Sequence, residues 1–327
     1  MENSMKKLSI CMCFWSMVSM CCVPMSFGAD NQQADQETSP VMSGDSWIAS
    51  GNDVMGASWW KKNAYNNQHV SGPLFYSFAA SYAYSGVNGS VESEKHNIST
   101  ELALRKQLFT SITFYDVSKD ETDLVLSGMS ITVEQEKFEQ FFRYALTDWL
   151  EAVGAIQLTK NDSSKYLKNR KLYFIGPWAD LLQRPNLYIG IGGSYAYLDT
   201  AYMNEQINPF IPMYEDFTPV DDYDSEGLYF LQMLSWNITD KIVFTENTTY
   251  LQDLDNTDYY NLNVHLALEF ALTDHLSVVS SYTVDYDYNS FVESVQNYLD
   301  KRTARGETAG ELDDTNSTVN FSIKITF

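Results

Sequence analysis

The segment Leu262–Leu272 has the sequence LNVHLALEFAL, and after Thr273-Asp274-His275 the chain continues over Leu276–Tyr288 as LSVVSSYTVDYDY. Apolar side chains occupy alternate positions in both segments, with polar or small side chains between them. The same alternation recurs in Leu74–Tyr84 and in the last segment, Val319–Phe327. A period of two indicates β-strands that have one apolar face and one polar or small face.

Two kinds of protein contain such strands, a soluble sandwich and a transmembrane barrel. The alternating segments are about 10–14 residues long, against about 5–6 for a typical soluble strand and about 9–11 for a strand that crosses a bilayer. Aromatic residues also gather at the loop ends of the strands, as at a membrane interface. They are Tyr84, Tyr195, Tyr197, Tyr250, Tyr286 and Tyr288. We therefore predict an all-β fold, a transmembrane antiparallel up-and-down β-barrel of about 12 strands.

Short and long connections alternate along the chain, which orients the predicted barrel. A Thr-Asp turn occurs at Ala145–Leu150, Asn237–Ile242 and Ala271–Leu276, and tight reversals are also expected at Ala103–Leu108 and Leu182–Pro185. Short turns are typical of the periplasmic rim and long loops of the exterior. The stretch Leu124–Val133 is compatible with an extra strand or with an extension of the next one. The expected exterior loops are Ser85–Lys95, Ser118–Glu136, Lys160–Lys168, Thr200–Asp224, Asp253–Thr257 and Asn289–Asp314.

Residues 1–28 have the pattern of a secretory signal peptide. Lys6-Lys7 precedes an apolar run, Leu8–Val23, and small residues follow near position 28. The alternatives are a transmembrane anchor, although the run is shorter than the roughly 20 residues that a spanning helix needs, and a lipid-anchored Cys21 or Cys22. The cysteines all lie in the first 22 residues, so the exported chain is expected to lack disulfides, thiolate nucleophiles and cysteine metal ligands.

Residues 29–72 are polar and predict a flexible, disordered periplasmic leader before a barrel over residues 73–327. Trp47, Trp59 and Trp60 are candidates for docking part of this leader on the barrel. The 43 acidic against 21 basic residues give a formal net charge of −22. A nucleic-acid-binding protein would need a basic surface, so we expect no nucleic-acid partner.

Several motifs, taken as an ordered set, resemble one known family. They are the Leu-Thr-Asp turns, the glycine-rich strand Ile189–Tyr195, the sequence Asp285-Tyr286-Asp287 and the closing strand to Phe327. Over about Gly72 to Phe327 the chain is similar to the salt-induced outer-membrane proteins of the domain-of-unknown-function 481 family. This resemblance implies a small outer-membrane barrel without an established enzymatic activity, and it supplies no catalytic residues. The sequence departs from the family pattern at Gly176-Pro177-Trp178, where we expect a bulge or kink because proline cannot donate to a sheet.

The last strand also resembles the C-terminal signal that the barrel-assembly machinery reads. Its apolar residues share one parity and end on an aromatic residue: Phe321, Ile323, Ile325 and Phe327. An outward-facing final strand would have the same pattern, and both interpretations are compatible. The expected partners are this machinery during biogenesis, and then outer-membrane lipid and lipopolysaccharide.

One exterior loop is strongly acidic and contains no Lys or Arg between Asp199 and Glu226. It is compatible with a solvated loop, or with a hard divalent cation bound through oxygen ligands. The candidate ligands are Asp221, Asp222, Asp224 and Glu226. No other cofactor is expected.

Charged residues on the polar parity of the strands are expected to line the lumen. Five lie near periplasmic turns and two lie towards the exterior: Glu101, Arg105, Glu151, Glu269 and Lys324, and then Asp285 and Asp287. They are compatible with a paired network that fills a narrow barrel, or with a narrow passive channel for small cations or solutes.

Catalysis is a further alternative, because some outer-membrane phospholipases carry His and Ser two residues apart on a strand, as in His275-Leu276-Ser277. However, His275 lies at an expected periplasmic turn without an evident partner group. We therefore expect no enzymatic activity. The sequence predicts a structural or envelope-stress barrel of the outer membrane, with a passive channel as the alternative.

Overall fold

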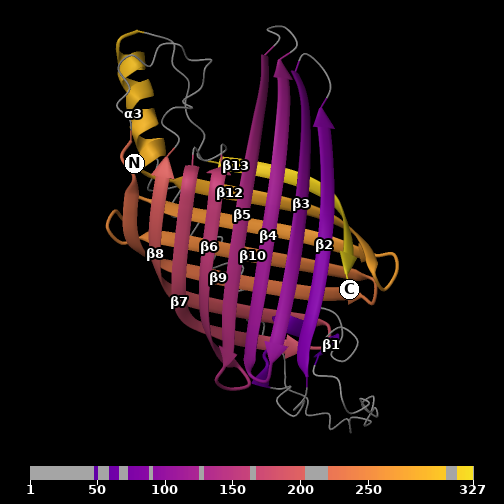
Figure 1. Cartoon of the computed structure of the whole chain (residues 1–327). Helices are drawn as coiled ribbons and strands as arrows, with labels where there is room; N and C mark the ends of the chain where they lie inside the picture. The colour runs from indigo at the N-terminus through magenta and orange to yellow at the C-terminus, as the bar shows by residue number, and fades with distance from the viewer. Residues whose placement is uncertain are drawn as a thin grey trace. The chain divides into compact units, whose positions relative to one another are not determined.

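The computed structural model of the protein describes residues 48–50, 59–65, 73–87, 91–124, 129–162, 167–202, 220–306 and 315–326 (Figure 1). The chain divides into two units, residues 1–43 and 44–327, and all the described residues belong to the second. The expected signal peptide, residues 1–28, lies outside the described residues.

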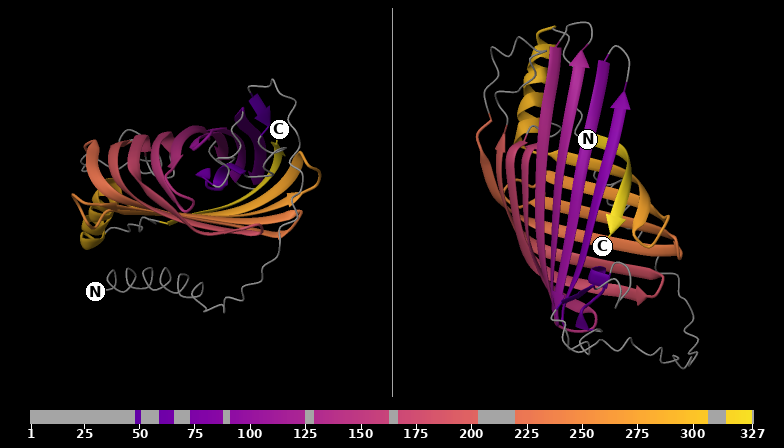
Figure 2. Two further views of the ribbon diagram at one scale, coloured as in Figure 1. Left: turned by 90° about the horizontal axis from the view of Figure 1, so that it is seen from below. Right: turned by 45° about the vertical axis from the view of Figure 1, so that its right-hand side comes forward.

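Twelve long strands of the described chain form one antiparallel sheet, which closes into a barrel because β2 pairs with β3 on one edge and with β13 on the other. In Figure 2 (left) these strands surround a single interior. The predicted fold, a 12-stranded antiparallel barrel, is confirmed. The strands are β2 (Leu74–Val87), β3 (Val91–Lys106), β4 (Phe109–Leu124), β5 (Met129–Ala145), β6 (Leu150–Asp162), β7 (Leu167–Arg184), β8 (Leu187–Tyr202), β9 (Tyr223–Thr239), β10 (Ile242–Asp253), β11 (Tyr260–Ala271), β12 (Leu276–Tyr288) and β13 (Thr315–Thr326).

The alternation of side chains separates an apolar outer face from a mixed interior. On β13, Phe321 and Ile323 are 65% and 56% exposed and face outward. On β7, Ile175 faces outward and is 69% exposed, while its neighbour Phe174 is buried in the interior. A continuous apolar exterior is unfavourable in water and is the face that a barrel presents to lipid. None of the helices within the described residues is long and apolar enough to cross a membrane.

The predicted short turns are confirmed, since each tight connection joins two paired strands at the expected position. Two predicted exterior loops are wrong in extent. Residues 85–87 and 91–95 continue β2 and β3, and residues 118–124 and 129–136 continue β4 and β5. No extra strand forms between 124 and 133 in the described chain, because β5 simply begins at Met129. In both places the backbones of the neighbouring strands stay paired beyond the apolar band, although the side chains there no longer alternate between apolar and polar.

The expected loop Asn289–Asp314 contains a helix, α3 (Ser290–Ala304), that the sequence analysis missed. The Asn289 side chain caps it by accepting hydrogen bonds from the backbone N–H groups of Phe291 and Val292, at 3.0 and 3.1 Å. Such a cap satisfies donors that the first helical turn leaves open. One face of α3 is buried through Phe291, Val295 and Tyr298. The helix lies at the end of the barrel opposite the short turns (Figure 1).

The bulge predicted at Pro177 is wrong. Pairing of β6 with β7 keeps its register through Ala152 and Pro177, and the register shifts between β7 and β8 lie at Leu167–Asn169 and Asp180–Leu182 instead. Next to the proline, β7 approaches β8 closely at Gly176. A Cβ at Gly176 would lie 2.2 Å from the carbonyl oxygen of Gly193.

Two described stretches of the expected leader belong to the barrel. Strand β1 (Ile48–Ser50) pairs in parallel with Leu74–Tyr76 of β2, beside the stretch of β2 that pairs with β13. The 3-10 helix η1 (Trp59–Lys61) brings two tryptophans to buried positions. The flexible character predicted for residues 29–72 therefore does not apply to these stretches. Docking through Trp59 and Trp60 is found, whereas Trp47 lies outside the described residues.

Candidate functional site: the barrel lumen

The end of the lumen at the short turns, which the sequence analysis expects to face the periplasm, contains a segment that is not part of the barrel wall. This segment, Trp59–Tyr65, is called the lumenal plug below. Trp59 and Asn63 are fully buried, and Trp60 and Ala64 are almost so. The two tryptophan rings meet edge to face with centroids 6.0 Å apart. They pack against Phe75, Ala103 and Ile112, which point inward from β2, β3 and β4.

Two arginines of the wall hold the backbone of the plug. Arg105 donates from Nη2 to the carbonyl oxygens of Lys62 (2.6 Å) and Trp60 (3.4 Å). Arg143 donates from Nη1 to the carbonyl oxygens of Trp60 (3.1 Å) and Lys61 (3.3 Å). The Arg105 guanidinium also lies 5.0 Å from the centre of a Trp59 ring. Charged donors make stronger hydrogen bonds than neutral ones, so these contacts fix the plug to β3 and β5.

Buried acids balance these arginines. Arg143 Nε lies 2.5 Å from Glu151 Oε2, and Glu151 is only 2% exposed. Asp180 accepts hydrogen bonds from Asn63 Nδ2 of the plug at 2.9 Å, from Trp178 Nε1 at 3.0 Å and from the Tyr188 hydroxyl at 2.5 Å. A buried charge is tolerated only where it is paired and hydrogen-bonded. The plug therefore completes a polar network that the wall begins.

A second charged group lies near the plug residue Lys61. Lys324 Nζ on β13 approaches Glu269 Oε2 on β11 at 3.3 Å, and both interact electrostatically with Lys61. Burial lowers the pKa of Lys61 from its ordinary value; Glu101 and Glu269 oppose this shift, and Lys324 adds to it. The neutral form of Lys61 is thus favoured in the docked plug more than in water.

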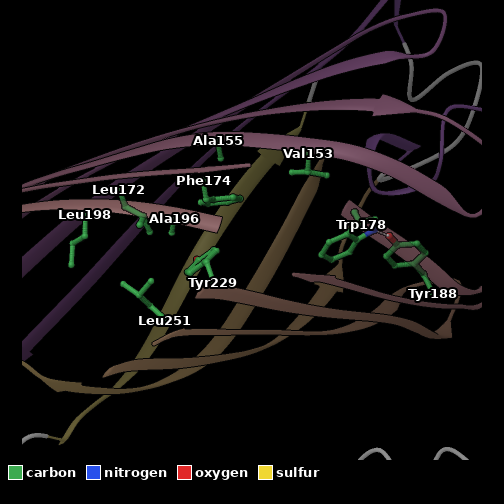
Figure 3. Packing of buried hydrophobic residues seen from close by; sticks show 10 residues of the cluster. All are labelled: Val153, Ala155, Leu172, Phe174, Trp178, Tyr188, Ala196, Leu198, Tyr229 and Leu251. Atoms are coloured by element: carbon green, nitrogen blue, oxygen red, sulfur yellow. Dashed lines mark hydrogen bonds between the residues drawn. The ribbon is translucent and has the colours of Figure 1, made fainter. Parts of the chain in front are cut away.

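Aromatic side chains fill the middle of the lumen. Successive ring pairs connect four strands, with centroid distances of 6.0 Å for Phe114–Phe141, 5.9 Å for Phe141–Phe174 and 4.5 Å for Phe174–Tyr229. Figure 3 shows Phe174 and Tyr229 within a larger buried cluster from β6 to β10. We call the four rings of Phe114, Phe141, Phe174 and Tyr229 the aromatic layer. Close packing of this kind leaves little room for water.

The small residues of β8 do not leave an open space, because Trp178 covers them. A Cβ at Gly190 would lie 2.3 Å from Trp178 Cζ2, and one at Gly192 would lie 2.8 Å from Trp178 Cε3. Trp178 and Tyr188 lie next to each other in Figure 3, and Trp178 Nε1 donates to the Tyr188 hydroxyl oxygen at 3.0 Å. The glycines therefore make space for an indole ring.

The exterior end of the lumen is bridged by an ion pair. Arg170 Nη1 on β7 lies 2.9 Å from Asp287 Oδ2 on β12, five strands away in the sheet. Both residues of this pair line a small pocket, together with Asn289, the N-cap of α3. The Tyr259 hydroxyl, in the loop between β10 and β11, donates to Glu293 Oε2 at 2.7 Å, and burial together with this carboxylate raises the pKa of Tyr259.

The predicted lumen-lining residues lie on interior positions of their strands. Glu101, Glu269 and Lys324 surround Lys61; Arg105 and Glu151 belong to the plug network. Asp285 accepts a hydrogen bond from Asn261 Nδ2 at 3.1 Å, and Asp287 pairs with Arg170. The first five lie at the short-turn end of the lumen, and Asp285 and Asp287 lie at the other end. Arg143, Asp180, Arg170 and the polar residues of the plug were not among the predicted residues.

The predicted cation site is not formed. The described residues, which include all four predicted ligands, contain no group of three or more acids, histidines or cysteines that could hold a metal ion. Asp221 and Asp222 precede β9, whereas Asp224 and Glu226 lie on its outer face. Strand geometry separates alternate residues by about 7 Å, so it spreads these carboxylates along the strand instead of gathering them.

The His275 and Ser277 side chains do not meet in a lipid-facing pair. His275 is exposed in the turn before β12, with Nδ1 3.1 Å from the carbonyl oxygen of Thr326. Ser277 is buried in the interior and its side chain interacts with Glu269. Of the predicted assembly signal, Phe321, Ile323 and Ile325 face outward, and Phe327 lies outside the described residues.

A family model described as a protein of unknown function, DUF481, matches residues 79–303, which include most of the barrel. The chain belongs to the DUF481 family. No curated protein matches the sequence.

Among solved structures, the chain is similar to the NanC porin, with 12% identity and a TM-score of 0.38 over 76% of this chain and 97% of that one. It is also similar to the translocator domain of the autotransporter NalP from Neisseria meningitidis, with 11% identity and a TM-score of 0.38 over 78% and 88%. The KdgM porin in complex with disordered oligogalacturonate matches with 6% identity and a TM-score of 0.36 over 77% and 99%. The protein's own strand pairing shows a closed antiparallel β-barrel.

Proposed function

We propose that this protein is a sealed barrel of a Gram-negative outer membrane, with a structural role in adapting the cell envelope to stress such as high salt. The observation that carries the proposal is the lumenal plug, which Arg105 and Arg143 hold by four hydrogen bonds to its backbone. The outer face suits contact with membrane lipid and lipopolysaccharide.

Conduction requires a continuous path of water or polar groups through the barrel. Here the path meets the plug at one end, the aromatic layer in the middle and the Arg170–Asp287 pair at the other end. Three obstacles at different depths favour a filled barrel over an open pore. Two buried arginines are also paired within the wall, Arg143 with Glu151 and Arg170 with Asp287, which supports a structural role for these charges.

The sealed state can be tested by osmotic swelling of proteoliposomes that contain the full-length processed protein. We expect swelling rates in small sugars and amino acids to equal those of empty liposomes. Swelling that depends on protein amount and on solute size would contradict a sealed barrel.

The envelope role requires a separate experiment in cells. A deletion strain should grow more slowly at raised salt and admit more of a dye that an intact outer membrane excludes, and the wild-type gene should restore both properties. Unchanged growth and permeability at every salt concentration would remove the envelope role while leaving the sealed barrel intact.

A narrow channel for small cations or solutes is the second candidate, because the plug comes from the segment before the barrel and not from the wall. Such a segment can leave the lumen without breaking a wall strand. If the plug gates a pore, the double variant Trp59→Ala/Trp60→Ala should conduct where the wild type does not. If the aromatic layer also seals the lumen, both proteins should be silent.

We propose that β13 also acts as the signal for the barrel-assembly machinery, since its outward residues Phe321, Ile323 and Ile325 form a continuous apolar row. Deleting Phe327 should lower the amount of heat-modifiable barrel in the outer membrane without affecting export.

The role we propose involves no catalysis, and a lipase or phospholipase assay with turnover above background would contradict it.

A further inference from the structure

A cluster of polar side chains that includes a carboxylate faces outward from β9 and β10, at a depth where the flanking outward residues of β9 and β11 are apolar. Glu246 accepts hydrogen bonds at Oε1 from Thr248 Oγ1 (3.2 Å) and from Gln232 Nε2 (3.4 Å). Both bonds reach the same carboxylate oxygen. Glu246 pairs in register with Leu234 on one side and with Leu266 on the other. The cluster Gln232–Glu246–Thr248 is called the outward polar cluster below.

Aromatic side chains place this cluster within the apolar band. Below it, Phe244 pairs in register with Trp236, which is 44% exposed. Above it, the rings of Phe230 and Tyr250 lie 6.4 Å apart. Glu246 lies four residues from the turn at Ile242, or about 13 Å along the strand, which is about 10 Å of depth at the usual strand tilt.

The position of Glu246 is not caused by a local irregularity. The register shift between β9 and β10 lies at Ile242–Val243, and both neighbouring strands pair continuously with β10 through Glu246. Among the described outward positions of β9, β10 and β11 between the aromatic residues, Glu246 is the only charged one. A charged side chain that faces hydrocarbon is costly and usually marks a covered or functional surface.

We propose that the outward polar cluster is the contact surface for a second copy of this chain in the membrane. When two copies are related by a two-fold axis along the membrane normal, each residue lies at the same depth in both copies. Glu246 and Gln232 of one copy then meet the same residues of the other. The cluster is complementary to itself, because the Gln232 amide both donates and accepts and the carboxyl oxygens of Glu246 accept.

The depth of the cluster argues against a lipid headgroup, a lipopolysaccharide phosphate or a different membrane protein as its binding partner. Lipid headgroups and lipopolysaccharide phosphates lie outside the band in which Leu234 and Leu266 flank Glu246. A different membrane protein would need its own polar group at this depth, whereas a second copy supplies one by symmetry. Hydrogen bonds across an interface in lipid contribute modestly, so we expect about a tenfold change in the dissociation constant for each bond that is lost.

A second polar group on the outer face provides a matched control. Thr113 Oγ1 donates to Gln140 Oε1 at 2.6 Å, and Gln140 Nε2 donates to Ser111 Oγ at 2.9 Å. This group lies on β4 and β5 and carries no charge. Its donors and acceptors satisfy one another, so the substitution Gln140→Leu is expected to leave association unchanged.

The experiment is sedimentation equilibrium of the full-length processed protein in detergent, for the wild type, Glu246→Leu, Glu246→Gln and Gln140→Leu. We expect the wild type, Glu246→Gln and Gln140→Leu to associate, and Glu246→Leu to shift to monomer with a dissociation constant at least tenfold higher. Because leucine suits a lipid-facing site, Glu246→Leu should fold and remain heat-modifiable.

Cross-linking in cell membranes gives an independent readout. A Leu234→Cys variant should form a disulfide-linked dimer, since Leu234 is partly exposed and lies in register with Glu246. Every native cysteine precedes residue 23 and is expected to leave with the signal peptide. A monomeric wild type, unchanged association of Glu246→Leu, or equal loss of association in Gln140→Leu would overturn the proposal.

Discussion

Replacing Trp59 by alanine tests how the lumen is sealed at the periplasmic end. Trp59 is fully buried and belongs to the plug, so its removal weakens docking without removing a residue of the barrel wall. Truncating a buried tryptophan costs about 3–5 kcal/mol. At 1.36 kcal/mol per factor of ten, the equilibrium between docked and released plug should shift by about two to four orders of magnitude. The contact of Arg105 with the Trp59 ring is lost as well.

Hydrogen exchange followed by mass spectrometry measures this docking directly, because amides are protected only while the plug is docked. In Trp59→Ala, protection of residues 59–65 should fall by about two orders of magnitude or more, while the strands keep wild-type protection. Trp149, which is 54% exposed in a turn, provides the control. In Trp149→Ala no protection should change. Equal protection of the plug in wild type and Trp59→Ala would refute the reasoning.

Three further predictions concern the interior. Gly190→Val should lower the free energy of unfolding by about 1–3 kcal/mol, measured by denaturant titration, because the new side chain displaces Trp178. Arg170→Leu should cost about 3–5 kcal/mol in the same assay, since it removes the cation that balances the buried carboxylate of Asp287. Exchange of the plug, corrected for intrinsic rates, should slow as the pH rises from about 7 to about 10. The pKa of Lys61 is lower in the docked plug than in the released plug, so the docked plug binds fewer protons at Lys61. Docking therefore strengthens as the pH rises from the lowered pKa towards the ordinary value of 10.5.

Each of these predictions has a control. Gly154→Ala should change stability by less than about 0.5 kcal/mol, because its Cβ would lie at an ordinary 3.7 Å from the Phe174 carbonyl oxygen. Arg170→Leu/Asp287→Leu should recover most of the loss in Arg170→Leu, and no recovery would show that the pair is not the cause. Lys61→Met should remove the pH dependence of plug exchange; persistence of that dependence would assign it to Glu101, Glu269 or Lys324.

The sequence predicted the fold because a period of two specifies which face of each strand meets lipid. The same alternation predicts from the sequence alone that residues such as Asp287 and Lys324 lie inside the barrel. Asp180 shares the interior parity of Phe174 and Trp178 on β7, and the register shift follows it, so the same alternation could have placed Asp180 in the lumen. Arg143 lies on the interior parity of β5, and attention to that parity alone could have found it.

The plug and α3 could not be predicted in the same way. Trp59–Tyr65 has no strand period, and its position depends on carbonyl groups that meet Arg105 and Arg143 from distant strands. The sequence indicates only that its tryptophans are candidates for docking on the barrel. Helix α3 has a local signal, since Asn289 precedes an apolar residue as an N-cap should. That signal was missed because the segment was assigned as a polar exterior loop.

Single-channel recording of the full-length processed protein in a planar bilayer tests the sealed lumen most directly. With potassium chloride on both sides, the account predicts no discrete conductance steps, at any voltage that the bilayer tolerates. A porin of known conductance in the same bilayer confirms that insertion can be detected. Regular steps from the wild-type protein, scaling with salt concentration, would contradict a lumen closed by the plug and the aromatic layer.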